Sequence, residues 1–277
     1  MEYITLHNGM QMPLLGFGTF QNTGEDCEKS VYTAIQSGYR LIDTAQAYGN
    51  EKQVGKAIKA SGIERNELFI VTKVNFPSYD DTEQVVLESL EKLGTSYVDL
   101  VLLHWPFGNR YAAWRTLEKL QETGSIKAIG ISNFEPDQMI DLIHFNKVIP
   151  VVNQIETNLY CQRQQEHQWL QKYGVAHMAY APLGQGHRNE MFAQPEIVKL
   201  AKKYEKTAAQ ILLRFFTQQG IIVIPKSIHE ERIKENIDSF DFKLTIDEIA
   251  ALRNLDKNEP LIGKSENPEF VEFAMNW

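Results

Sequence analysis

The sequence predicts an α/β protein, a (β/α)8 TIM barrel that forms a single domain over residues 1–277. Short aliphatic runs alternate with amphipathic helical patterns eight times along the chain. Strands that alternate with helices pair in parallel, with right-handed crossovers between them. Eight such pairs in 277 residues fit the size of a closed barrel, and an apolar fraction of 43% is sufficient for a large core.

The eight predicted strands are short runs rich in Val, Ile, Leu and aromatic residues. They are LLGFGTF from residue 14, YRLIDTA from 39, LFIVTKV from 68, VDLVLLHW from 98, IKAIGISN from 126, PVVNQIE from 150, VAHMAYAP from 175 and IIVIPKS from 221. The helical patterns cover residues 25–37, 50–61, 80–93, 110–123, 135–145, 162–173, 195–219 and 229–239. No linker or low-complexity tract interrupts this rhythm, so no domain boundary is expected.

Two pieces lie outside the eight repeats. Residues 3–13 predict a β-hairpin with an Asn-Gly pair near its turn, which we expect to close the bottom of the barrel. Residues 245–255 predict an extra C-terminal helix that begins with a capping box of Thr245 and Glu248. Within the barrel, Asn50 is expected to cap the second helix.

Charge and composition argue against several classes of partner. The 36 acidic and 28 basic residues give a net charge of −8, which disfavours nucleic acid and anionic membrane surfaces as partners. The apolar runs are too short to span a bilayer, and MEYITLHNGM does not resemble a signal peptide. Cys27 and Cys161 fit no disulfide framework or metal motif, so we expect free thiols, no metal and a cytoplasmic location. We also expect a monomer, since no long apolar helix face is left over.

Polar residues follow three successive predicted strands. Asp43 and Tyr48 follow the second strand, Lys73 ends the third and His104 ends the fourth. Each has an ordinary explanation taken alone: a turn-capping carboxylate, a surface aromatic, a rim lysine and a buried histidine. Because the carboxyl ends of barrel strands meet at one rim, the four side chains are expected to lie together.

These four residues suit proton donation to a carbonyl oxygen. A free phenol with a pKa of about 10 is a weak acid, and we expect the Lys73 ammonium to lower the pKa of Tyr48. Asp43 would hold Lys73, and His104 would orient the carbonyl group. Aromatic residues around VNF and HWPF suit a small organic carbonyl compound. A proton alone reduces nothing, so the hydride must come from a nicotinamide.

The motifs LGFGTF, IDTAQAYGNE, VTKV, LLHWP, IGISNF, NQIE, YAPLGQG and IPKS resemble those of the aldo-keto reductases, in order from about residue 4 to 245. The chain is most similar to compact bacterial members, such as 2,5-diketo-D-gluconate and glyoxal/methylglyoxal reductases. The resemblance implies that Tyr48 is the general acid, Lys73 its partner, Asp43 the residue that holds the lysine and His104 the residue that orients the substrate.

The resemblance also implies the cofactor contacts. Ser132, Asn133 and Gln154 would hydrogen-bond the nicotinamide carboxamide, and Tyr180 would stack on the nicotinamide ring. The pocket for the 2′-phosphate of NADPH and the adenine end would be formed by Lys226, Ser227, Arg232, Glu235 and Asn236.

Residue chemistry adds to this assignment. The chain has no Rossmann fingerprint after an early strand, but barrels commonly bind phosphate at the loops after strands seven and eight. Gly18 and Thr19 are small enough for a cofactor to approach, and Leu183 and Gln185 lie in a loop that could wrap a pyrophosphate. The cations in IPKSIHEER suit a dianionic phosphate, although an ordinary solvated helix start would carry such residues too. We therefore expect a preference for NADPH over NADH.

The substrate pocket is expected to be open and shallow. Phe20 and Trp105 are its expected wall residues, Asn75 stands where bulkier aromatics occur in relatives, and the loop after His104 is short. These features favour small aldehydes, dicarbonyls or keto-sugars. The tail aromatics Phe270, Phe273 and Trp277 either line this pocket or only pack on the barrel.

Two other functions remain open from the sequence. Lys73 at a strand end could form a Schiff base with a carbonyl substrate, as in aldolases. Alternatively, the chain could be a non-catalytic NADPH-binding redox sensor.

Overall fold

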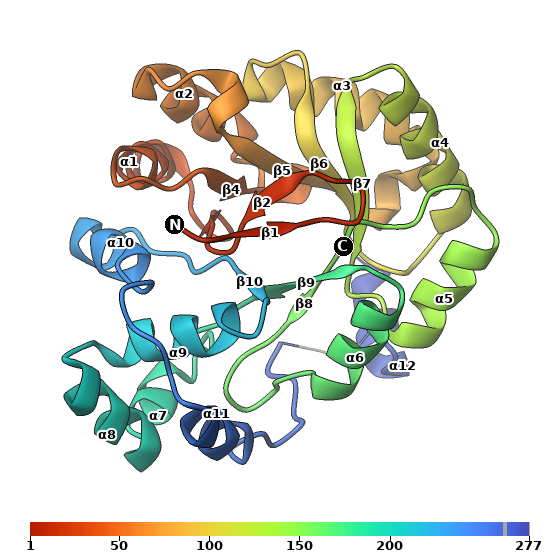
Figure 1. Ribbon diagram of the computed structural model, residues 1–277. Helices are drawn as coiled ribbons and strands as arrows, with labels where there is room; N and C mark the ends of the chain where they lie inside the picture. Colours follow the sequence, from red (N-terminus) through yellow and green to blue (C-terminus); the bar gives the residue numbers. More distant parts are fainter. Residues whose placement is uncertain (263–264, 277) are drawn as a thin grey trace.

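Eight parallel strands form a closed barrel in the computed structural model, which describes residues 1–262 and 265–276. The strands follow the order β10-β9-β8-β7-β6-β5-β4-β3 in one sheet. Leu15 and Val223 form a parallel bridge between the two ends of this sheet and so close it. The helices surround the strands (Figure 1), as the sequence predicts for a (β/α)8 barrel.

All eight barrel strands lie within the predicted runs. They are β3 (Phe17–Gly18), β4 (Leu41–Asp43), β5 (Phe69–Val74), β6 (Val98–Leu103), β7 (Ile126–Ser132), β8 (Val152–Glu156), β9 (Ala176–Tyr180) and β10 (Ile222–Val223). The outer helices include α1 (Gly24–Gln36), α2 (Glu51–Ser61), α3 (Thr82–Leu93), α4 (Arg110–Glu122), α5 (Pro136–His144), α6 (Gln164–Lys172) and α10 (Glu230–Ile237).

The predicted single helix over residues 195–219 is wrong. The chain forms α8 (Pro195–Tyr204) and α9 (Ala208–Thr217) instead. Glu205 ends α8 in the left-handed region with φ 54°, and Thr207 starts α9 with a side-chain capping box. Residues 202–207 are polar apart from Tyr204, and Thr207 with Gln210 is the sequence signal that could have revealed the new helix start. Two short helices, α7 (Arg188–Phe192) and α12 (Pro268–Ala274), were not predicted.

The N-terminal hairpin closes one end of the barrel. Strands β1 (Tyr3–Thr5) and β2 (Gln11–Pro13) pair in antiparallel fashion and cross that end in Figure 1. Leu6, Met12 and Leu14 are buried against the apolar side chains inside the barrel. The predicted hairpin is therefore confirmed, and it fills the end from which the strands start.

The extra C-terminal helix α11 (Ile246–Arg253) begins at the predicted capping box. Asn50 occupies the predicted N-cap position of α2, but its side chain makes no cap hydrogen bond. Its Nδ2 instead donates to the carbonyl oxygens of Thr19 at 2.9 Å and Asn22 at 2.8 Å. Asn50 therefore ties together the loops that follow β3 and β4.

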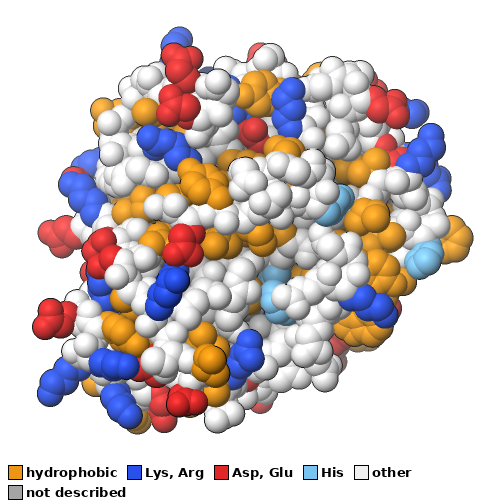
Figure 2. Space-filling view, in the orientation of Figure 1, with side chains coloured by type: hydrophobic (Ala, Val, Ile, Leu, Met, Phe, Trp, Pro, Cys, Tyr) orange, Lys and Arg blue, Asp and Glu red, His pale blue; other side chains and the backbone are white. Residues whose placement is uncertain are grey.

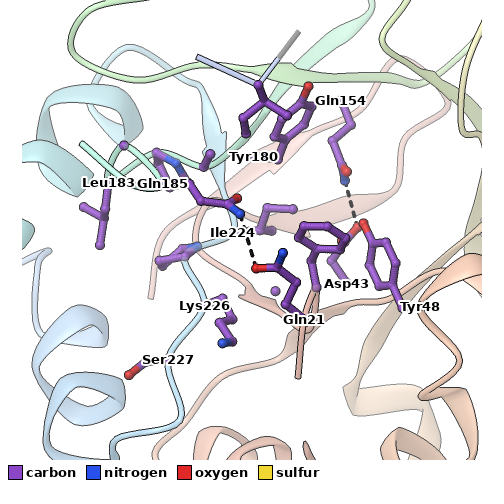
Figure 3. Close-up of a pocket in the computed structure, with 18 of the residues that line it drawn as sticks. Gln21, Asp43, Tyr48, Gln154, Tyr180, Leu183, Gln185, Ile224, Lys226 and Ser227 are labelled. Carbon is purple, nitrogen blue, oxygen red and sulfur yellow. Dashed lines mark hydrogen bonds between the residues drawn. The ribbon is translucent and has the colours of Figure 1, made fainter. Parts of the chain in front are cut away.

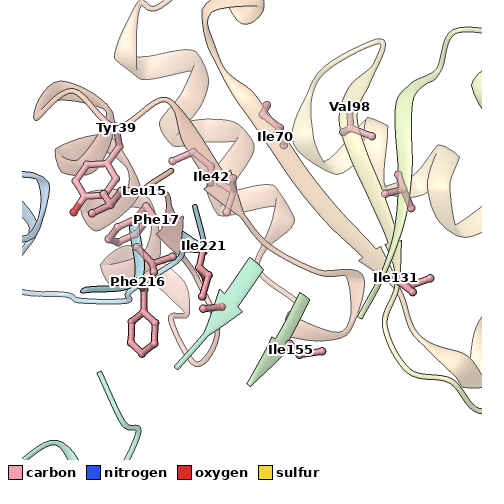
Figure 4. Close-up of a cluster of buried hydrophobic side chains, with 14 of the residues drawn as sticks. Leu15, Phe17, Tyr39, Ile42, Ile70, Val98, Ile131, Ile155, Phe216 and Ile221 are labelled. Carbon is pink, nitrogen blue, oxygen red and sulfur yellow. The ribbon is translucent and has the colours of Figure 1, made fainter. Parts of the chain in front are cut away.

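Alternation along each strand separates two apolar cores. Leu100 and Leu102 face the barrel interior, whereas Val101 and Leu103 pack under the helices. Part of the outer core, including Ile42 and Ile70, is shown in Figure 4. The same period of two directs Asp43, Lys73, His104, Ser132, Gln154 and Tyr180 inward at the carboxyl ends of their strands.

The surface shows no strongly basic face in the view of Figure 2, where acidic and basic side chains are intermixed around the edge. Within residues 1–262 and 265–276, no helix has the length and apolar character to cross a membrane. Those residues also contain no cluster of three or more His, Cys, Asp or Glu side chains suited to a metal ion. Cys27 and Cys161 are buried free thiols.

Candidate active site

A cavity of about 980 Å³ opens at the carboxyl ends of the strands, opposite the hairpin. The loops after β3, β4, β9 and β10 line it, together with residues of α12. In Figure 3, Asp43 and Tyr48 lie at one end of the cavity, and Lys226 and Ser227 lie at the other. The acid–base groups and the cationic residues therefore lie at different ends of the cavity.

The floor of the cavity contains a buried ion pair. Lys73 Nζ lies 2.6 Å from Asp43 Oδ1, and both side chains are at most 2% exposed. The ammonium also donates to the Thr44 carbonyl oxygen at 2.8 Å and to the Tyr48 hydroxyl at 3.4 Å. Its three donors are thus all used, which fixes the lysine beneath the phenol. Lys73 does not line the cavity itself.

Burial opposes the charge on both members of this pair. It raises the pKa of Asp43 and lowers the pKa of Lys73, while the attraction between the two groups acts in the opposite direction on each. Gln154 Nε2 donates to the second Asp43 oxygen at 2.8 Å and further favours the carboxylate. The pair keeps its charges because each buried polar atom has a partner.

The expected lowering of the Tyr48 pKa is contradicted. Burial, and after it the negative charge of Asp43, raises the pKa of the Tyr48 phenol well above its ordinary value. The Asp43 carboxylate offsets the nearby ammonium, so the two charges act on the phenol together. Tyr48 therefore keeps its proton at neutral pH, which is the form that a proton donor needs.

His104 stands beside Tyr48 with ring centroids 5.8 Å apart. Burial, and then the positive charge of Lys73, lowers the pKa of His104 well below its ordinary value, so the imidazole is neutral. Its Nδ1 is buried and has no hydrogen-bond partner among the described residues. A neutral imidazole at this position can donate a hydrogen bond to a carbonyl compound or accept one from it.

The predicted carboxamide-binding residues form a network at the ends of β7, β8 and β9. Tyr180 Oη donates to Asn133 Oδ1 at 2.8 Å, and Asn133 Nδ2 donates to the His104 carbonyl oxygen at 2.9 Å. Ser132 Oγ donates to the Gln154 carbonyl oxygen at 2.8 Å. The three predicted carboxamide-binding residues, Ser132, Asn133 and Gln154, line the cavity together with Tyr180, the predicted stacking residue, but Gln154 uses its amide to hold Asp43.

The far end of the cavity gathers positive charge. Lys226 and Arg232 line it as predicted, and so does Arg188, which sequence reasoning missed. Burial, and after it the positive charge of Arg232, lowers the pKa of Arg188. None of the three cations forms an ion pair with a residue that the structure describes. The loop position of Arg188 opposite IPKS was the signal that could have found it.

The remaining predicted residues at this end have structural partners. Ser227 Oγ accepts the His229 N–H at 3.1 Å and so shapes the start of α10. Glu235 accepts a hydrogen bond from Thr207 Oγ1 at 2.8 Å, and the buried Asn236 lies beside it on the cavity wall.

Two loops meet over the cavity. Leu183 and Gln185 line it from the loop after β9, and Gln185 Nε2 donates to Gln21 Oε1 at 3.3 Å (Figure 3). Gln21 belongs to the loop after β3, and its contribution was not predicted. The contact joins opposite sides of the cavity with two neutral amides.

Gly18 and Thr19, which were predicted to contact the cofactor, also have structural roles. A Cβ atom on Gly18 would lie 2.8 Å from the Ile224 carbonyl oxygen, so this glycine permits barrel closure. Thr19 is fully buried and donates its hydroxyl to the Asp43 carbonyl oxygen at 3.0 Å. Gly18 lines the cavity, whereas Thr19 lies beneath it.

Comparison with known proteins agrees with this arrangement. The Aldo/keto reductase family model matches residues 14–257. Methylglyoxal reductase DkgA of Escherichia coli is 41% identical over 261 residues, which cover 93% of this chain and 94% of that protein.

The chain belongs to the aldo-keto reductase family.

Solved structures of family members share its fold. An aldo-keto reductase from a Medee basin deep-sea metagenome library superposes with a TM-score of 0.94 at 38% identity, covering 95% of this chain and 98% of that one. The Bombyx mori aldo-keto reductase, solved in complex with NADP, gives a TM-score of 0.89 at 34% identity, covering 96% of both chains. The protein is therefore an oxidoreductase that acts on carbonyl compounds.

Aromatic side chains surround the Tyr48 end of this aldo-keto reductase. Phe20 packs against Tyr48 with ring centroids 5.0 Å apart, and Trp105 lies 5.2 Å from the ring of Phe270. Phe270 and Phe273 line the cavity, which decides between the two alternatives for these tail aromatics. Trp277, the third tail aromatic, lies outside the described residues.

Removal of one member of the buried ion pair should destabilise the fold strongly. Lys73→Met leaves the Asp43 carboxylate buried without its cation, and we expect a loss of about 3–5 kcal/mol in the free energy of unfolding. The double variant Asp43→Asn/Lys73→Met should recover part of this loss, because no unpaired charge remains. Denaturant unfolding measures both.

The exposed pair of Lys92 and Glu88 provides the matched control. Lys92→Met should change the free energy of unfolding little, since water screens this pair. A double variant at Asp43 and Lys73 that is less stable than Lys73→Met would contradict the interpretation.

Proposed function

We propose that this protein reduces small aldehydes, dicarbonyls or keto-sugars to alcohols with NADPH, and that Tyr48 is the proton donor. The observation that carries the proposal is the Tyr48 hydroxyl, which lies 3.4 Å from Lys73 Nζ at the floor of the cavity. The phenol keeps its proton, and an ammonium is in place to stabilise the phenolate that forms when the proton leaves.

The residues of the cavity fit NADPH. Lys226, Arg232 and Arg188, which form no ion pair with a described residue, supply the charge that a 2′-phosphate requires. Tyr180, Ser132 and Asn133 offer an aromatic face and polar groups nearer to Tyr48, where a nicotinamide would lie. When bound there, NADPH supplies the hydride that reduces the carbonyl carbon.

The protein residues then handle the proton. Tyr48 Oη donates its proton to the carbonyl oxygen as negative charge develops on it. Lys73, held by Asp43 at 2.6 Å, stabilises the resulting phenolate. The neutral His104 orients the carbonyl group by a hydrogen bond. The proton and the hydride together convert the carbonyl group to an alcohol.

The substrate class rests on the shape of the Tyr48 end. Phe20 and Trp105 form an apolar wall, while Asn75 adds a polar group in place of a larger aromatic. The 41% identical relative from E. coli is named a methylglyoxal reductase, which supports a small dicarbonyl as one substrate. We further propose that residues 1–277 form one domain that acts as a cytoplasmic monomer.

The two other candidate functions have less support. Lys73 is fully buried under Asp43, Thr44 and Tyr48, so its amine is poorly placed to attack a carbonyl compound. A redox sensor without catalysis has no need for the intact arrangement of Asp43, Lys73, Tyr48 and His104.

Tyr48→Phe should abolish most of the reduction. Loss of the proton donor should reduce kcat by about 10²–10⁴-fold, because general acid catalysis contributes that much. The dissociation constant of NADPH, measured by fluorescence titration, should change little. Tyr32→Phe removes a hydroxyl from an exposed tyrosine of α1 and serves as the control. Retention of most activity by Tyr48→Phe would exclude it as the acid.

The raised pKa of Tyr48 predicts the pH dependence of reduction. A proton donor works below its pKa, so an upward shift extends the active range upward. We expect kcat to stay nearly constant from neutral pH to about pH 10, the ordinary pKa of a phenol, and to fall only above it. The test is a pH profile of kcat at saturating NADPH. A fall in kcat centred at about pH 8 would show that the charge of Lys73 outweighs burial in setting the pKa of Tyr48.

Arg232→Ala should weaken the preference for NADPH. Loss of one of the cations at the far end should reduce the ratio of kcat/KM for NADPH over NADH by about tenfold to a hundredfold. The value for NADH should change little, since NADH lacks the 2′-phosphate. Lys234→Ala, which removes a cation from the same helix, is the control because Lys234 does not line this cavity. Equal losses with both cofactors would place Arg232 outside the phosphate site.

A further inference from the structure

Glu156, the last residue of β8, carries a buried carboxylate that the proposed chemistry does not use. Its side chain is only 3% exposed. Oε1 accepts the backbone N–H of Leu261 at 2.6 Å and the Asn158 side-chain amide at 3.0 Å. Oε2 accepts the backbone N–H of Ile262 at 3.0 Å. One carboxylate thus binds two successive backbone amides that lie more than a hundred residues further along the chain.

These amides are the main partners of the charge. The nearest arginine, Arg163, forms its ion pairs with Glu135 at 2.6 Å and Glu166 at 3.0 Å. A buried carboxylate needs hydrogen bonds at both oxygens, and here backbone N–H groups supply them. A glutamine at this position would present an NH₂ group to one of the two N–H donors. The arrangement therefore requires an acidic residue.

The chain that Glu156 holds forms part of the cavity wall. Ile262 lines the cavity directly, and Phe270 and Phe273 line it from α12. Glu156 pairs with Tyr180 in the register of β8 and β9, so the anchor lies next to the cofactor end of the same strands. The main chain of Lys257 is also bound, since its N–H donates to the Tyr160 carbonyl oxygen at 2.9 Å.

We propose that Glu156 is a positioning residue that holds the C-terminal chain against the cavity and thereby sets the affinity for apolar, aromatic carbonyl compounds. The inference rests on the proposed function for its substrate and on the hydrogen bonds of the Glu156 carboxylate for its anchor. Small dicarbonyl compounds, which reach Tyr48 without filling the space next to Phe270 and Phe273, depend less on this wall.

Glu156→Gln tests the proposal in the full-length protein with NADPH. We expect KM for 4-nitrobenzaldehyde to rise about three- to tenfold, which corresponds to about 0.7–1.4 kcal/mol, the contribution of one ordinary hydrogen bond. KM for methylglyoxal, kcat for both compounds and the dissociation constant of NADPH should change less than twofold, within about 0.4 kcal/mol. Glu259→Gln removes an equal charge from an exposed residue of the same segment and should leave all of these values unchanged.

A double-mutant cycle with Phe273→Ala separates positioning from general damage. Phe273→Ala removes part of the wall itself, so it should raise KM for 4-nitrobenzaldehyde as well. If Glu156 acts through the wall, Glu156→Gln should raise KM for 4-nitrobenzaldehyde little further in the Phe273→Ala background. Fully additive effects, or equal increases in KM for both carbonyl compounds, would overturn the proposal.

Hydrogen exchange tests the anchor independently of catalysis. At least one of the amides of Leu261 and Ile262 should exchange at least tenfold faster in Glu156→Gln than in the wild type, because the glutamine NH₂ group replaces one of the two acceptor oxygens. Unchanged exchange overturns the anchor even if the enzyme is active. A wild-type protein that reduces no carbonyl compound overturns the proposed function, while the exchange result still stands. If Glu156→Gln does not fold, Glu156→Asp keeps the charge, withdraws the oxygens and should give the same pattern at smaller size.

Discussion

The buried attraction between Asp43 and Lys73 is the constraint on which the rest of the site depends. The two groups lie 2.6 Å apart on neighbouring strands, out of contact with water. Neither could be buried alone at acceptable cost, so the pair fixes the relative position of β4 and β5 at the rim. Tyr48 is attached to that pair through Lys73, and Gln154 supports it from the opposite side of the barrel. The acid of the proposed reaction is thus held by contacts from three strands or their loops.

The strand pattern explains how the chain delivers these groups to one place. A period of two directs every second residue inward, and the closure of the sheet brings the inward residues from distant strands together. Glycine at position 18 is part of this arrangement, because a side chain there would collide with the carbonyl oxygen of Ile224. The loops after the strands then need only add Tyr48 and the cations to a floor that the barrel provides.

The sequence was most informative where a residue's role follows from its place on a strand. Asp43, Lys73 and His104 could be grouped because strand ends meet at one rim, and the confirmed hairpin and capping box follow local rules. Predictions failed, or were not made, where a residue's role depends on its surroundings in the folded chain. The pKa of Tyr48 depends on how deeply its hydroxyl is packed, and the amide of Asn50 is used by loops that only the folded chain brings near. Arg188 begins the short helix α7, which was too short to show a helical period, and the break after Glu205 was missed although Thr207 and Gln210 form a capping box there.

The N-terminal hairpin closes one end of the barrel, so the active-site cavity opens only at the other end. Leu6, Met12 and Leu14 fill the end of the barrel where the strands begin. Cofactor, carbonyl compound and alcohol must therefore all pass the same rim, where Gln21 and Gln185 line the cavity. Because all three share one opening, the binding and release rates of the cofactor, the substrate and the product depend on one another.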